Sequence, residues 1–122
     1  MVGQLIALLF LARDLTHREH LRVTGPGSYA KHMALGEFYP AIVELADKLA
    51  EAYQGQNGII EDLPLLDNEY GGDIVGVLDM HVKWIKANRY LDISRDDSPL
   101  QNIIDEIVGQ YLSTLYKLKF LQ

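Results

Sequence analysis

Hydrophobic residues recur at three- and four-residue steps along most of the chain, a spacing typical of amphipathic helices. One such stripe comprises Leu35, Phe38, Ile42, Leu45, Leu49 and Tyr53. A shorter one comprises Ile74, Leu78, Val82 and Ile85. A wide one near the C-terminus comprises Leu100, Ile103, Ile104, Ile107, Val108, Tyr111, Leu112 and Leu115. No segment alternates convincingly as a strand would, so the pattern predicts an all-α chain.

The first predicted helix, over residues 2–22, is apolar on nearly every face in its first half. Leu5 to Ala12 reads LIALLFLA, which predicts burial on several sides, either in a bundle or at a subunit interface. No basic residue precedes this run, as one would in a signal peptide, and a membrane helix needs about 20 apolar residues. We therefore expect a buried helix in a cytoplasmic protein with no membrane partner.

Turn-forming residues predict where the first two helices end. Gly25-Pro26-Gly27 ends the first helix, because proline cannot continue it and glycine tolerates turn geometry. Ser28 is the expected N-cap of the second helix, and Gly55 is expected to end it. Pro40 lies inside this helix and either kinks it or marks a restart. We favour a kink, because the apolar stripe stays in phase across the proline.

The longest predicted connection covers residues 56–72. The third helix is expected from about Asp73, its N-cap, to Asn88, and the fourth begins with Ser98 as N-cap and Pro99 at the first helical position. A helical hairpin needs only a few loop residues, so a connection of this length indicates a crossover along the bundle. Residues 1–122 are thus predicted to form one domain, a ferritin-like four-helix bundle with a long crossover between helices 2 and 3.

Charge and cysteine content narrow the chemistry. The chain has no cysteine, which excludes disulfides, zinc–thiolate sites, iron–sulfur clusters and thiol nucleophiles. Its formal net charge is −6 at pH 7, and no basic stripe is present. Non-specific nucleic-acid binding depends on neutralising phosphates, so we expect no nucleic-acid partner.

Two histidines and two carboxylates form a candidate metal constellation. They are His20, His32, Asp47 and Glu51, and imidazole with carboxylate suits iron, zinc or manganese. His20 and His32 flank the turn, so a hairpin would bring them together. Asp47 and Glu51 are four residues apart and share a helix face.

The spacing along helix 2 decides how such a site would be built. His32 and Asp47 are fifteen residues apart, which is roughly 22 Å along a helix axis. One chain therefore cannot place both on one ion. Two copies of helix 2, antiparallel about a two-fold axis near Pro40, would bring the histidines of one chain to the carboxylates of the other. We expect a homodimer through helix 2 or a larger homo-oligomer.

This stretch resembles the Dps proteins, the mini-ferritins of bacteria. The matching positions, each at the family's spacing, are His20, Gly25, His32, Asp47 and Glu51. The resemblance implies a ferroxidase centre at a dimer interface, with iron as its metal and Fe(II) oxidised by peroxide or oxygen. The chain departs from the family's pattern at Leu21, Ser28 and Met33, where Trp, an aromatic residue and Glu are usual. It also has no basic tail, so DNA binding is not carried over.

A second interpretation leaves out the metal. Each of the four residues alone also fits a solvated helix surface, and small proteins of tailed bacteriophages look similar to this chain. In that case the bundle is a non-catalytic interaction protein that binds a host or partner protein through its acidic surface or residues 56–72. His17 is a candidate accessory ligand, and His81 has no evident partner and fits a surface or satisfied core histidine. The seven tyrosines fit core or interface positions rather than redox relays.

Overall fold

A computed structural model describes residues 1–68 and 72–122 of the chain. Over this described part the structure has four helices and no strand, which confirms the all-α prediction. Their bounds are α1 Val2–Arg22, α2 Ser28–Asn57, α3 Ile74–Asn88 and α4 Ser98–Phe120. None of these helices combines the length and the apolar content that a membrane crossing requires.

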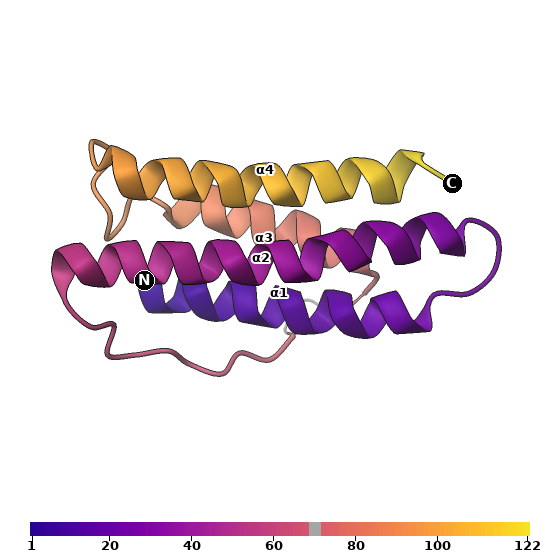
Figure 1. Ribbon diagram of the computed structural model, residues 1–122, viewed down its shortest axis with the longest axis horizontal. Coiled ribbons are helices and arrows are strands. Elements are labelled where there is room, and N and C mark those ends of the chain that lie inside the picture. The colour runs from indigo at the N-terminus through magenta and orange to yellow at the C-terminus, as the bar shows by residue number, and fades with distance from the viewer. Residues whose placement is uncertain (69–71) are drawn as a thin grey trace.

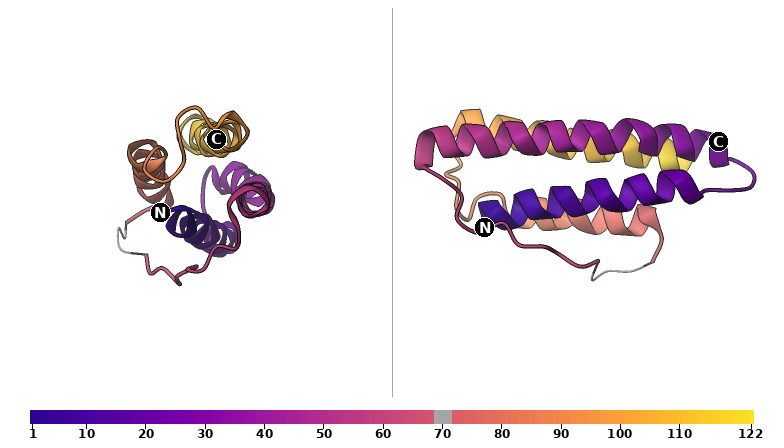
Figure 2. Two further views of the ribbon diagram at one scale, coloured as in Figure 1. Left: turned by 90° about the vertical axis from the view of Figure 1, so that its left-hand side faces the viewer. Right: turned by 60° about the horizontal axis from the view of Figure 1, so that its bottom comes forward.

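The four helices lie side by side with their axes roughly aligned (Figure 1). Seen end on, they occupy the corners of a square (Figure 2), where α1 contacts α2 and α3, and α4 contacts the same two helices. α1 and α4 run in one direction and α2 and α3 in the other. Each helix is therefore antiparallel to both of its neighbours.

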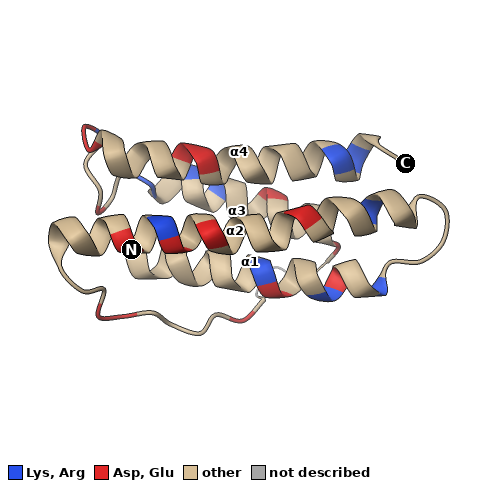
Figure 3. Cartoon of the chain, in the orientation of Figure 1, with Lys and Arg blue, Asp and Glu red and all other residues tan. Residues whose placement is uncertain are grey.

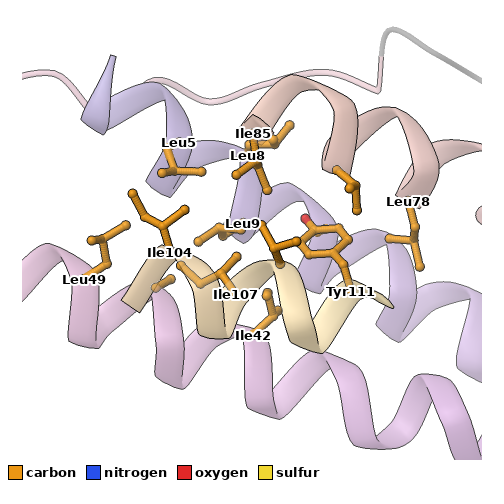
Figure 4. Packing of buried hydrophobic residues seen from close by; sticks show 14 of the residues in the cluster. Leu5, Leu8, Leu9, Ile42, Leu49, Leu78, Ile85, Ile104, Ile107 and Tyr111 are labelled. Carbon is orange, nitrogen blue, oxygen red and sulfur yellow. The ribbon is translucent and has the colours of Figure 1, made fainter. Parts of the chain in front are cut away.

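The inner faces of all four helices form one hydrophobic core (Figure 4). Its fully buried members include Leu5, Leu9, Phe38, Ile42, Leu78, Ile85, Ile104 and Ile107. Burying each such side chain contributes about 1.5–3 kcal/mol. Most of the apolar run in α1 is buried as predicted, although Phe10 is exposed.

Residues 58–68 follow α2 and run back beside α1 (Figures 1 and 2). The backbone of Asp62 approaches Gly3 so closely that a side chain at position 3 would overlap its carbonyl oxygen. Ile60 and Leu66 of this segment pack against the hydrophobic core. Residues 69–71 of the predicted 56–72 connection lie outside the described residues.

The ends of α2 differ from the prediction. Gly27 rather than Ser28 is the N-cap, because the chain enters the helix through a left-handed conformation, with φ of +79° at Gly27, that glycine adopts without strain. The helix also continues to Asn57, and Gly58 rather than Gly55 caps it, with φ of +93°. α2 runs through Pro40 without interruption, so the alternative of a restart there is wrong.

The starts of α3 and α4 agree more closely with the sequence. The side chain of Asp73 accepts a hydrogen bond of 2.8 Å from the backbone N–H of Gly76, which confirms Asp73 as the N-cap of α3. Asp97, not Ser98, is the N-cap of α4. Ser98 is instead its first residue, so Pro99 stands at the second helical position, where its missing N–H is still without consequence.

Candidate functional site

His20 and His32 meet beside the turn between α1 and α2. Their rings stack with 3.7 Å between centroids and 17° between planes. His20 lies in the last turn of α1, and His32 lies in the second turn of α2. The tight turn between the helices, with left-handed conformations at Gly25 and Gly27, brings the two rings together. We call them the histidine pair.

Each ring of the histidine pair is held by the backbone of the other residue. His20 Nδ1 donates to the carbonyl oxygen of His32 at 2.7 Å, and His32 Nδ1 donates to that of His20 at 2.7 Å. A carbonyl oxygen can only accept, so Nδ1 carries the proton in both rings. In the neutral rings Nε2 therefore keeps its lone pair, which is the form that ligates a metal.

The histidine pair also stabilises the fold. The carbonyl of His20 is one of the last four in α1, which have no partner within the helix. His32 satisfies this carbonyl from across the turn and so ties the end of α1 to the start of α2. This role requires no metal, and sequence reasoning missed it.

Two residues of α2 complete the surroundings of the histidine pair. Tyr39 stacks on His17 at 4.1 Å between centroids and lies edge to face with the ring of His20 at 5.4 Å. A Cβ at Gly36 would lie 3.0 Å from Cε1 of His20, so the absence of a side chain makes room for that ring. The spacing of His32, Gly36 and Tyr39, four and then three residues, was the available signal, because it places them on one side of α2.

Asp47 and Glu51 are exposed in the C-terminal half of α2, far along the helix from the histidine pair. This half of the helix carries most of the acidic bands of α2 in Figure 3. Within residues 1–68 and 72–122, no three His, Asp or Glu side chains of the single chain are grouped so that they could hold an ion. A single chain thus brings the two histidines together and leaves the two carboxylates apart from them, as the spacing argument requires.

One exposed face of α2 extends over both halves of the helix, the N-terminal half that holds His32 and the C-terminal half that holds Asp47 and Glu51. Its residues recur at steps that keep them on one face, and we call them the outer face of α2. They are Tyr29, Met33, Pro40, Glu44, Asp47 and Glu51. Apolar side chains occupy the N-terminal half, where Tyr29 is 75% and Met33 is 48% exposed, and carboxylates occupy the C-terminal half. The two halves therefore differ in chemistry.

His81 and Tyr111 form a separate buried pair between α3 and α4. Nδ1 of His81 and the hydroxyl of Tyr111 are hydrogen-bonded at 3.0 Å, and both side chains are fully buried. Burial lowers the pKa of His81 to about 4, because the charged ring would lose its hydration. Burial likewise raises the pKa of Tyr111 well above its usual value. His81 is therefore a core histidine, one of the two alternatives expected for it.

Comparison with known protein families places the chain in one of them. A family model described as a family of unknown function (DUF5856) matches residues 20–118. The chain belongs to this family. The range matched by the DUF5856 model includes all four candidate ligands, the whole of α2 and α3, and most of α4. No protein of curated function and no solved structure is significantly similar to this DUF5856 member.

Proposed function

We propose that this chain is a ferritin-like bundle with a crossover between α2 and α3, and that it binds iron between two subunits as the Dps proteins do. His20 and His32 of one subunit and Asp47 and Glu51 of the other are the proposed ligands. The observation that carries the proposal is the hydrogen bonding of the histidine pair, because donation by both Nδ1 atoms leaves both Nε2 atoms available to a metal. Metal-ligating histidines almost always donate their second ring nitrogen in this way.

A two-fold dimer through the outer face of α2 supplies the missing carboxylates. In an antiparallel arrangement about Pro40, residue 32 of one subunit lies opposite residues 47 and 48 of the other. The apolar half of each outer face, with Tyr29 and Met33, then packs against the partner and is removed from water. The acidic half, with Asp47 and Glu51, meets the partner's histidine pair. The N-terminal half of each outer face thus lies against the C-terminal half of the other, at both ends of the interface.

Iron is the substrate of the proposed site. Histidine with carboxylate ligands binds Fe(II), and the carboxylates stabilise the Fe(III) product because their negative charge matches its higher charge. The proposed reaction oxidises two Fe(II) by one electron each. One hydrogen peroxide takes up these two electrons with two protons and forms two waters. Molecular oxygen is the alternative oxidant.

Anaerobic Fe(II) titration tests the proposal with variants that separate ligation from folding. His20→Asn with His32→Asn keeps a side-chain N–H near the position of Nδ1 but removes the Nε2 ligand. Asp47→Asn with Glu51→Gln removes both carboxylate charges, and Glu44→Gln is a control on the same outer face. We expect binding by the wild type and Glu44→Gln, and none by either paired variant. Equal binding by all four proteins would sink the proposal.

A non-catalytic interaction protein is the second candidate, and one observation favours it. Residues 58–68 expose three large apolar side chains, Ile59, Leu63 and Leu65, and apolar side chains gathered on a surface often mark a protein-binding site. Capture of one stoichiometric partner from bacterial lysate, lost in Leu63→Ser with Leu65→Ser, supports this candidate. Metal binding by the wild type without any captured protein contradicts it.

A further inference from the structure

A second surface, on α4, has the properties of a contact between copies of this chain. Leu112, Tyr116 and Phe120 follow one another at four-residue steps and are 47%, 55% and 71% exposed. Residues at this spacing lie on one face of a helix. Asp105 and Gly109 precede them on the same face, which we call the outer face of α4. It is therefore polar in its N-terminal part and apolar in its C-terminal part.

Gly109 lies in the middle of α4, where glycine costs about 1 kcal/mol relative to alanine. Two other helical glycines are explained by close neighbours within the chain, since Gly3 makes room for the backbone of Asp62 and Gly36 for the ring of His20. A Cβ at Gly109 would have no atom within 4 Å. The outer face of α4 thus has open space at Gly109 beside an apolar stripe, and we call this space the notch.

The charges beside this face favour a second copy of α4 as the partner, packed antiparallel to the first. Lys119 contacts Asp79 and Asp105 contacts Arg89, so both lie along the edge of the outer face that borders α3. Lys119 is at the C-terminal end of this edge, and Asp105 is towards its N-terminal end. Two α4 helices packed antiparallel about residues 112 and 113 bring Lys119 of each copy beside Asp105 of the other. Parallel packing would instead place like charges together.

The same antiparallel arrangement places a large side chain of one copy opposite a glycine of the other. Residue 116 of one copy lies opposite residue 109 of the other, so each Tyr116 ring fills the partner's notch at Gly109. The apolar half of each face covers the polar half of the partner, and both copies use the same residues, as a two-fold interface requires. We propose that the outer face of α4 is a self-association surface, distinct from the outer face of α2 and independent of metal binding.

Two glycine variants test this proposal with the full chain. Gly109→Gln fills the notch, and it also raises the intrinsic helix propensity, so a loss of association cannot be ascribed to a weakened fold. Gly55→Gln is the matched control, because a Cβ there also meets open space but lies at the end of α2. Native mass spectrometry and sedimentation velocity give the mass of each assembly, and thermal unfolding gives its stability.

The expected result is a lower mass for Gly109→Gln than for the wild type, with unchanged or higher thermal stability, and the wild-type mass for Gly55→Gln. The lower mass is that of the dimer formed through the outer face of α2, or that of the monomer where this dimer does not form. A failure of the α4 surface is therefore distinguishable from a failure of the proposed metal site. A monomeric wild type overturns the proposal, and so does an unchanged mass for Gly109→Gln.

Discussion

The buried pair of His81 and Tyr111 makes the stability of this protein depend on pH. Neutral His81 fits the core, whereas the unfolded chain protonates this ring near its ordinary pKa of about 6.5. The folded pKa is lowered to about 4, so folding favours the neutral ring. Its contribution to stability is therefore complete above about pH 6.5 and is lost as the pH falls from there towards 4.

The size of the effect follows from the shift. A fall from 6.5 to about 4 corresponds to about 3 kcal/mol in total, at about 1.4 kcal/mol per pKa unit. About 2 kcal/mol of this is lost by pH 5, because the unfolded ring is then almost fully protonated and the folded ring is not. A loss of that size is a substantial part of the 5–15 kcal/mol typical of a folded domain.

Urea unfolding between pH 7.5 and 4.5 measures the effect in the wild type and in His81→Leu with Tyr111→Phe. This double variant removes both members of the hydrogen bond, so it does not leave the Tyr111 hydroxyl without its partner. Other titrating groups are common to both proteins and cancel in the difference. The wild type is expected to lose about 2 kcal/mol more than the variant by pH 5. Parallel stability profiles would refute the reasoning.

Two further predictions concern single contacts. Gly36→Ala should lower stability and weaken iron binding, because its methyl would lie 3.0 Å from Cε1 of His20, a ring that a hydrogen bond and a stacking contact hold in place. Gly55→Ala should instead gain about 0.5–1 kcal/mol in the same urea assay. Gln101→Leu should lower the free energy of unfolding by about 2 kcal/mol. The buried amide of Gln101 donates to the carbonyls of Arg89 and Ile93, and it accepts a hydrogen bond from the Arg89 side chain. Gln4→Leu, at an exposed position of α1, is its control, and equal losses in the two variants would contradict this account of Gln101.

Three apolar stripes predicted three of the helices, because a stripe follows directly from the 3.6-residue period of a helix that buries one side, and the first helix was predicted from its run of apolar residues. The N-cap of α3 at Asp73 was also predictable from local sequence, because the side chain of an N-cap residue accepts a hydrogen bond from a backbone N–H only three positions further along the chain. The C-terminal end of α2 was not. Gly55 and Gly58 can both adopt the left-handed conformation that ends a helix, and only the packed chain shows which of them does.

Helical spacing and the turn predicted only part of the candidate site. The turn predicts that the two histidines meet, but the exchange of hydrogen bonds between their rings and backbones depends on how closely α1 approaches α2. The pairing of His81 with Tyr111 joins residues thirty positions apart and depends on the packing of α3 against α4. Contacts of this kind follow from tertiary structure and have no periodic signal in the chain.

The most direct test of the intersubunit site is complementation between two inactive variants. Chains with His20→Asn and His32→Asn are co-expressed with chains carrying Asp47→Asn and Glu51→Gln, each of which alone should bind no Fe(II). About half of the dimers are then mixed, and each mixed dimer has one complete site of two, so binding should return to about a quarter of the wild-type level. Recovery at that level is the result predicted by a site shared between subunits. No recovery, with a wild type that binds iron, would contradict it.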